Sequence, residues 1–144
     1  MNEINRFNDF CENVMRWSAE RGIYTHSTAL AQGLKALSEV GELADAAIKN
    51  DMDALKDAIG DVAVCTVNVM HMDRAVFDVA YIFDDRPTTV SLQRGVACTG
   101  YSVGHMCNSL AGGRAAADTS DTVDMVLLAL RGTALARAEA ATIR

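Results

Sequence analysis

The sequence predicts an all-α fold, and we expect an antiparallel helical bundle of about five helices. Apolar residues recur at helical spacing along nearly the whole chain. Half of the residues are hydrophobic and only one is proline, which argues against extended disorder. At 144 residues the chain is long enough to bury a sizeable core, so we expect residues 1–144 to form a single helical domain.

The first two helices follow from their apolar spacing and end signals. The first begins near Ile4, and Gly22 should end it. Ser27 or Thr28 can cap the second helix. Its predicted core stripe has residues three and four positions apart: Leu30, Leu34, Leu37, Gly41, Ala44 and Ile48. Further apolar residues widen this arc past half of the circumference, so we expect the helix to be covered on more than one side.

A third helix is predicted from about residue 53 to about residue 73, after a short break at Asn50-Asp51. Residues 77–83 are apolar and fit either a helical extension or a short extended segment. The Asp-Asp-Arg-Pro sequence at 84–87 is typical of a turn.

The last two helices complete the predicted bundle. A fourth helix should begin near Thr88 or Thr89 and end at the glycine pair 112–113. Thr119 or Ser120 should cap the fifth helix.

Four carboxylates lie in the apolar middle of the chain, Glu39 and Glu42 on the second helix and Asp57 and Asp61 on the third. Their spacing places each pair on one helix face, and two consecutive helices can bring such faces together. Asp57 and Asp61 share a stripe with Asn68 among apolar neighbours, so we expect this stripe to be buried or semi-buried. Crowded carboxylates repel each other unless a cation lies between them, and oxygen ligands suit Mg²⁺ or Mn²⁺. A solvated helix face is the alternative interpretation.

A weak internal repeat appears when the chain is shifted by 63 positions. The shift aligns Glu39 with Ser102, Val40 with Val103, Gly41 with Gly104, Glu42 with His105, Asp61 with Asp124 and Asn68 with Arg131. This pattern suggests a duplicated helical hairpin, with the metal site in the copy at about 28–73 and a degenerate copy at about 88–143. Chance similarity between helices rich in alanine and valine is the alternative.

The sequence Lys-Ala-Leu-Ser-Glu-Val-Gly-Glu-Leu at 35–43, followed by Ala-Ile-Gly-Asp-Val at 58–62, resembles the MazG-like all-α nucleoside triphosphate pyrophosphohydrolases. The likeness is strongest to the short phage-encoded members, and Trp-Ser-Ala-Glu-Arg-Gly at 17–22 fits them too. The resemblance covers roughly residues 15–68. The C-terminal half matches only loosely.

The family binds Mg²⁺ with an E-E-x-x-E motif and an E-x-x-D motif. The resemblance places Glu39, Glu42 and Asp61 on metal-ligand positions. Ser38 replaces the first glutamate of the first motif, and Ala58 replaces the glutamate of the second. These departures leave open the number of metal ions and the role of Asp57, which lies one residue before Ala58 and therefore about 100° away around the helix.

The resemblance implies hydrolysis between the α- and β-phosphates of a nucleoside triphosphate, with Mg²⁺, or Mn²⁺ in its place, as cofactor. Glu39 would be a metal ligand and the general base, and Asp57 an additional ligand or an orienting residue. Lys35 would contact phosphate, or only pair with Glu39 one turn away. Asn68 would bind sugar or phosphate or hold a metal-bound water, or else join helices by a buried hydrogen bond. Trp17 would stack on the base, or belong to the core.

The base is not readable from the sequence, although the phage-like appearance favours dGTP or GTP. A dUTP, dCTP or phosphoribosyl-ATP hydrolase is a related alternative. From other classes, the chain could be a non-catalytic helical oligomer that binds nucleotide or metal, or a regulator that binds alarmones without turnover. Ser38 and Ala58 favour these non-catalytic alternatives.

Composition restricts the partners. The net charge of −6 argues against binding to polymeric nucleic acid. No apolar run is long enough for a membrane span, and the polar N-terminus does not resemble a signal peptide. The four cysteines form no C-x-x-C pair. We therefore expect a cytoplasmic protein, in the host cytoplasm if a phage encodes it, and the wide apolar arcs predict a homodimer or homotetramer.

Overall fold

The computed structural model describes residues 2–84, 90–112 and 116–142, and these confirm the all-α class. They form five long helices and no strand: α1 (Glu3–Glu20), α3 (Ala29–Ile48), α4 (Met52–Met72), α6 (Leu92–Ala111) and α7 (Ala116–Thr142). Two single-turn helices, α2 (Ile23–His26) and α5 (Val79–Ile82), lie in the connections. Within the described ranges, no helix combines the length and the hydropathy needed to cross a membrane.

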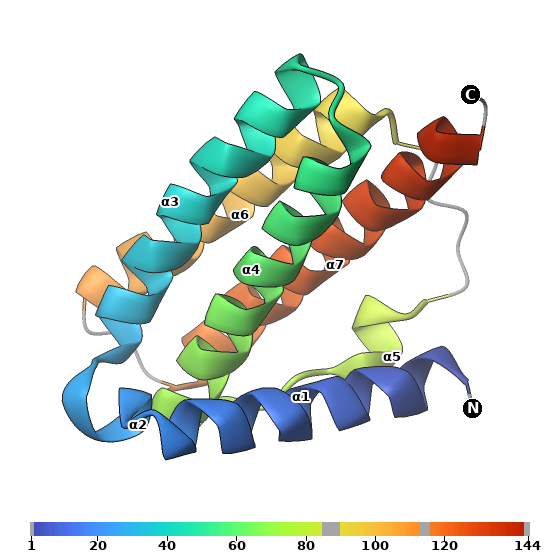
Figure 1. Ribbon diagram of the computed structural model, residues 1–144. Coiled ribbons are helices and arrows are strands. Elements are labelled where there is room, and N and C mark those ends of the chain that lie inside the picture. The colour runs from blue at the N-terminus through green and yellow to red at the C-terminus, as the bar shows by residue number, and fades with distance from the viewer. Residues whose placement is uncertain (1, 85–89, 113–115, 143–144) are drawn as a thin grey trace.

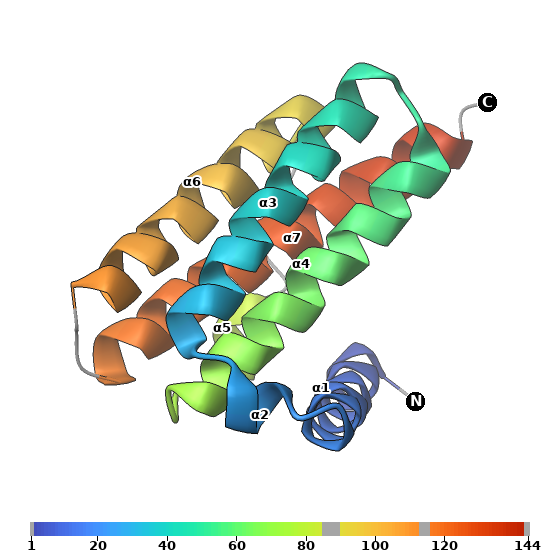
Figure 2. The same ribbon diagram turned by 60° about the vertical axis from the view of Figure 1, so that its left-hand side comes forward.

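Helices α3, α4, α6 and α7 form the bundle (Figure 1). Helices α3 and α4 make one antiparallel hairpin, and α6 and α7 make another. The hairpins pack side by side, α3 against α6 and α4 against α7 (Figure 2). Helix α1 crosses one end of the bundle and contacts α4. The sequence range 28–73 is therefore one structural hairpin, and most of 88–143 is the other.

The helices begin where polar residues accept backbone N–H bonds. The side chains of Asn2, Thr28, Asp51 and Ser91 cap α1, α3, α4 and α6 in this way. Gly22 has a φ of 72°, a left-handed conformation that glycine adopts readily, and it separates α1 from α2. The predicted start and end of the first helix and the predicted start of the second helix are thus confirmed.

Helix α3 buries a different face from the predicted one. Leu34, Leu37 and Ile48 of the predicted core stripe are 52%, 42% and 83% exposed. The residues that α3 buries are Gln32, Gly33, Ala36, Leu43 and Ala46. Most of these side chains are small, which lets the neighbouring helices approach closely. The prediction placed large apolar residues in the core, whereas the face of α3 that packs closely against its neighbours consists mostly of small residues.

The predicted starts of the last two helices are also corrected. Helix α6 begins at Leu92 after the Ser91 cap, and Thr88, Thr89 and the turn residues 85–87 lie outside the described residues. Helix α7 already includes Ala116, so Thr119 and Ser120 are inside the helix and do not cap it. The Thr119 hydroxyl instead donates a hydrogen bond to Asp73, which joins the start of α7 to the end of α4.

The contacts between the hairpins have the reciprocity that a duplication would produce. Gly33 of α3 faces Cys107 of α6, whose Sγ would lie 3.3 Å from a Cβ at position 33. The shift of 63 positions aligns Gly33 with Val96 and Cys107 with Ala44. Val96 and Ala44 pack in one hydrophobic cluster. The duplication remains a prediction, which superposition of the two hairpins would test.

Gly95 provides a test of the close helix packing. A Cβ at this position would lie 2.7 Å from Oγ1 and 3.1 Å from Cα of Thr133 on α7, so Gly95→Ala should cost about 1–3 kcal/mol of stability. Gly104, on the same helix, has no atom within 4 Å of such a Cβ, so Gly104→Ala should be neutral or stabilising by up to about 1 kcal/mol. Urea unfolding of both variants measures the difference. Equal effects would show that α6 and α7 do not pack as described.

Candidate metal centre

Three carboxylates meet between α3 and α4. Glu39, Glu42 and Asp61 each offer one oxygen, and these oxygens all lie within 4.8 Å of one another. The two glutamates are one turn apart on α3, and Asp61 comes from the adjacent antiparallel helix. The structure therefore brings together the three residues that the sequence resemblance predicted as metal ligands.

One oxygen of this group is buried without a partner. The Glu39 side chain is 13% exposed, and its Oε2 has no hydrogen-bond partner among the described residues. Lys35 Nζ lies 3.9 Å from the other oxygen, Oε1. Burial raises the pKa of Glu39, and so do the neighbouring carboxyl of Glu42 and the charge of Asp61. An orphaned oxygen beside two other carboxylates fits a hard divalent cation, because Mg²⁺ and Mn²⁺ take oxygen ligands.

Asp57 lies apart from this group. It is on α4, one turn before Asp61, but it is not among the three carboxylates that converge within the described part of the chain. Asp57 and Asp61 are both exposed, so the prediction that their stripe is buried holds only for Asn68. The least exposed of the four carboxylates is Glu39, which is partly buried.

A cavity of about 330 Å³ opens beside the carboxylates. Its lining combines the acids with a lysine, two amides and apolar side chains: Trp17, Ile23, Gln32, Lys35, Glu39, Asp61, Val64, Cys65 and Asn68. The predicted site residues Trp17, Lys35 and Asn68 thus share one cavity with Glu39 and Asp61. Its volume is in the range of small-molecule sites.

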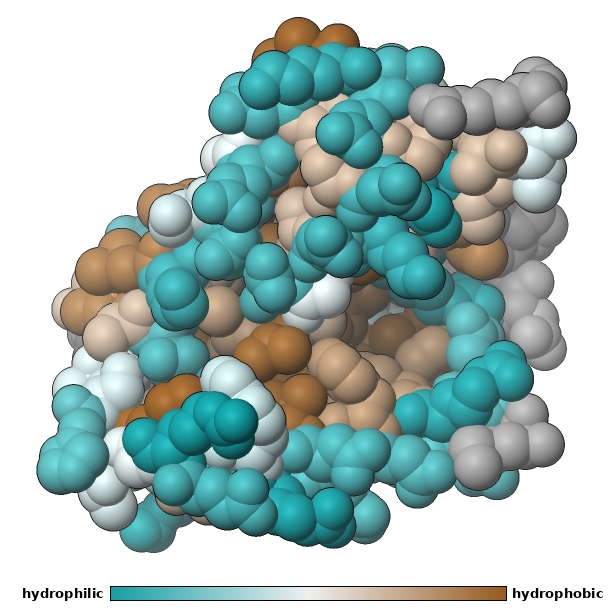
Figure 3. All heavy atoms as spheres, viewed as in Figure 1, coloured by the Kyte–Doolittle hydropathy of each residue, from teal (hydrophilic) through white to brown (hydrophobic). Residues whose placement is uncertain are grey.

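Trp17 lies at the mouth of this cavity. It is 45% exposed, and the Arg21 guanidinium lies 4.2 Å from the centre of its ring. It also lines a neighbouring hollow of about 380 Å³, which Phe10 and Val64 share. Figure 3 shows hydrophobic side chains in the trough between the bundle and α1, bordered by hydrophilic ones. Trp17 is therefore a partly exposed ring on a cavity wall rather than a core residue.

Asn68 is at the centre of a buried polar network. Its Oδ1 accepts hydrogen bonds from the Ser18 and Tyr24 hydroxyls, both at 2.8 Å. Its Nδ2 donates to Gln32 Oε1 at 3.0 Å. The network joins α1, α2, α3 and α4 at the inner end of the cavity.

Sequence reasoning missed two residues of this region, Gln32 and Tyr24. Gln32 had a detectable signal, because it continues the face of Lys35, Glu39 and Glu42 at spacings of three, four and three. Tyr24 had none, because its role depends on the position of α2, which follows a left-handed glycine.

Cys65 lines the cavity but is not a nucleophile there. Burial is the largest cause that raises its pKa, to about 11, so it carries a neutral thiol at neutral pH. It contributes apolar surface next to the acids.

The second hairpin carries a cavity in the corresponding place. Of the residues that line the acidic cavity, those at 32, 35, 39 and 65 align under the shift with Gly95, Cys98, Ser102 and Leu128. All four of these line a cavity of about 250 Å³ between α6 and α7. The second cavity thus has no counterpart of the amide, the lysine and the glutamate at these aligned positions. This pattern is what a degenerate copy of the site would show.

Asp124, which aligns with Asp61, has a backbone partner. Its Oδ1 accepts the Asp78 N–H at 2.9 Å, and the residue is buried. Burial raises its pKa, and the charges of Asp78 and Asp121 add to this, while the Asp78 N–H acts in the opposite direction. The segment before α5 therefore contacts this acid directly.

The raised pKa of Asp124 predicts a pH dependence. The folded protein binds the Asp124 proton more tightly than the unfolded chain, so this group lowers stability as pH rises above the ordinary aspartate value of 3.8. Asp124→Asn keeps an acceptor for Asp78 and should flatten this slope without loss at pH 7. Asp124→Ala should cost about 1 kcal/mol through the lost hydrogen bond. Urea unfolding between pH 4 and 7 separates the two variants, and an unchanged slope in Asp124→Asn would contradict this assignment.

Comparisons with known proteins give one informative result. The chain is 38% identical over 56 residues to an uncharacterized 18.2 kDa protein from the rep–hol intergenic region of Haemophilus phage HP1. The alignment covers 39% of this chain and 34% of the phage protein, so the chain spans about a third of that relative's length. No family model matches the chain, and no solved structure matches it. A phage therefore encodes a protein that is similar over part of this chain.

Proposed function

We propose that this protein is a divalent-metal-dependent nucleoside triphosphate pyrophosphohydrolase of the MazG-like kind. The observation that carries the proposal is the convergence of Glu39, Glu42 and Asp61, with a buried Glu39 oxygen that lacks a partner. The cavity beside these acids supports the proposal, because it adds a cation and an aromatic ring at a size that suits a nucleotide.

Each part of the cavity then has a role. Glu39, Glu42 and Asp61 hold Mg²⁺ or Mn²⁺, which offsets phosphate charge and lowers the pKa of bound water. Glu39 would also accept a proton from the attacking water. Lys35, at the same face one turn away, attracts the phosphates. Trp17 offers its ring to the base.

Asp57 has no ligand role in this proposal. Its carboxylate is exposed and outside the convergent group. We propose dGTP or GTP as the substrate and the host cytoplasm as the place of action. The similarity to part of a phage protein supports the phage setting.

The test is pyrophosphate release from the eight common ribo- and deoxyribonucleoside triphosphates, with and without Mg²⁺ or Mn²⁺. Metal-dependent formation of monophosphate and pyrophosphate from one or a few of them would support the proposal and name the base. Binding without turnover would favour the regulator. If the folded protein neither binds nor hydrolyses any of the eight, the proposed function is wrong for these substrates.

We also propose that α3 and α6 contact a second copy of this chain. Leu34 and Leu37 on α3 are about half exposed, and Tyr101 on the adjacent α6 is 71% exposed. Gly41 leaves open space on α3, which would admit side chains of a partner. This is the apolar arc that the sequence predicted to be covered.

The oligomer is tested by light scattering. We expect a dimer or tetramer, and we expect Leu37→Glu to produce monomers, because it places a charge in an apolar contact. Leu135→Glu is the matched control, since Leu135 is 47% exposed on α7. A monomeric wild type would exclude the interface.

A further inference from the structure

Helix α1 reaches the cavity from outside the bundle. Its apolar contacts lie along the part before Trp17, where Cys11 and Val14 pack with Val67, and Phe7 packs against Phe77 and Phe83. Trp17 itself belongs to none of the hydrophobic clusters of the described residues, so the polar contacts near it are the ones that fix this end of α1.

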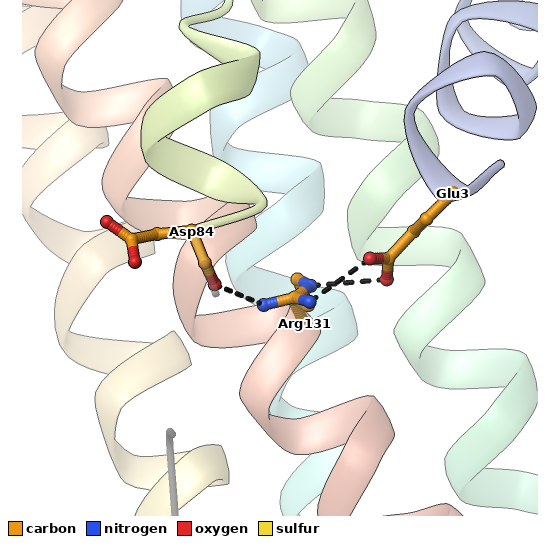
Figure 4. A network of polar contacts seen from close by, with 3 residues as sticks. All are labelled: Glu3, Asp84 and Arg131. Carbon is orange, nitrogen blue, oxygen red and sulfur yellow. Dashed lines mark hydrogen bonds and ion pairs between the residues drawn. The ribbon is translucent and has the colours of Figure 1, made fainter. Parts of the chain in front are cut away.

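Each end of α1 forms a polar contact with one of the two hairpins. The residues of the hairpins that make these contacts are aligned by the 63-residue shift. At the end near the cavity, Ser18 donates to Asn68. At the start of α1, Arg131, which aligns with Asn68 under the 63-residue shift, donates to both oxygens of Glu3 at 3.1 and 3.2 Å. Arg131 also donates to the Asp84 carbonyl at 3.4 Å (Figure 4). The Glu3 pair is partly exposed, so the buried Asn68 contact is the stronger of the two.

Asn68 has little capacity left for a ligand. Its amide offers two acceptor positions and two N–H donors, and three of these four are used by Ser18, Tyr24 and Gln32. Its exposed fraction is 1%. Ser18 and Tyr24 do not line the cavity, although they bind the residue that does.

We propose that Asn68 is a positioning residue, which holds α1 and α2 against α3 and α4 so that Trp17 forms the cavity wall on which a nucleobase stacks. This inference rests on the proposed nucleotide site. In this inference Asn68 joins the helices by buried hydrogen bonds and makes no direct contact to sugar, phosphate or metal-bound water. Residues that never touch the nucleotide, above all Tyr24, then control its affinity.

The experiment uses Trp17 as its own probe, because it is the sole tryptophan of the chain. Tyr24→Phe and Ser18→Ala each remove one hydroxyl from the network, and Tyr81→Phe is the matched control on an exposed tyrosine of α5. Binding of the four deoxynucleoside monophosphates is followed by Trp17 fluorescence, and Mn²⁺ binding by equilibrium dialysis. Hydrogen exchange of the α1 amides is measured on the same samples.

We expect Tyr24→Phe to weaken monophosphate binding at least fivefold, to speed exchange at the C-terminal end of α1, and to leave Mn²⁺ affinity within twofold. Tyr81→Phe should match the wild type in all three measurements. In the double variant with Asn68→Ala, Tyr24→Phe should add no further loss, because both changes remove one interaction.

Three results would overturn the inference. Asn68→Ala could lose binding while Tyr24→Phe and Ser18→Ala bind as the wild type does, which would make Asn68 a direct contact. Tyr24→Phe could weaken Mn²⁺ binding as much as nucleotide binding, which would indicate general structural damage. The wild type could show no Trp17 response to any monophosphate. Failure of the proposed hydrolysis is distinct, because it would leave the Tyr24→Phe binding and exchange effects in place without pyrophosphate release.

Discussion

Glu39→Gln is expected to lower metal-dependent pyrophosphate release by about a hundredfold or more. The change keeps the size of the side chain but removes the charge of the partly buried carboxylate that lies beside Glu42 and Asp61. Even residues that only support a metal ligand are worth about 10- to 100-fold in affinity or activity, so a ligand that also accepts a proton should be worth at least as much. Initial rates at saturating Mg²⁺ measure the effect.

The matched control is Asp57→Asn, which removes one negative charge from an exposed acid on the helix that carries Asp61. We expect it to retain activity within about threefold, because only general electrostatics change. Circular dichroism should show unchanged helix content in both variants. Equal loss in Asp57→Asn and Glu39→Gln would restore Asp57 to the ligand set, and full activity in Glu39→Gln would remove Glu39 from the mechanism.

The second large effect is on stability. A metal that binds only the folded protein should add about 2.7 kcal/mol at a concentration of 100 times its Kd. This corresponds to a rise in Tm of roughly 10 °C for a domain of this size. Melting curves with and without Mg²⁺ or Mn²⁺ at pH 7 measure it.

Glu39→Gln should lower activity without lowering the stability of the metal-free protein. Without metal, the variant should be as stable as the wild type or more so, because it removes one of three carboxylates that repel each other. With metal, it should show little of the rise in Tm. A clear loss of stability in the metal-free variant would mean that Glu39 has a structural partner that this account lacks.

The sequence was sufficient for the fold class and for the acidic site because both depend on local spacing. Residues three and four apart share a helix face in any helical fold, so Glu39 and Glu42 had to lie together. Asp61 joined them because a short connection makes α3 and α4 antiparallel neighbours.

Features set by packing between helices were not predictable in this way. The face that α3 buries contains small residues such as Gly33 and Ala36. A prediction from hydrophobic spacing assigns such residues to the core less readily than leucine. The start of α7 was predicted wrongly because threonine is a common capping residue. Thr119 instead lies inside α7, and its hydroxyl donates a hydrogen bond to Asp73. The separation of Asp57 from the site, although it lies one turn from Asp61, depends on how α4 is positioned against α3, which no local pattern records.

The most direct test of the metal centre is equilibrium binding of Mn²⁺ to the wild type, Glu39→Gln and Asp57→Asn. We predict saturable binding by the wild type and by Asp57→Asn, and its loss in Glu39→Gln. If none of the three proteins binds Mn²⁺ saturably, or if all three bind it equally well, Glu39, Glu42 and Asp61 are not a metal site and the proposed hydrolysis loses its basis.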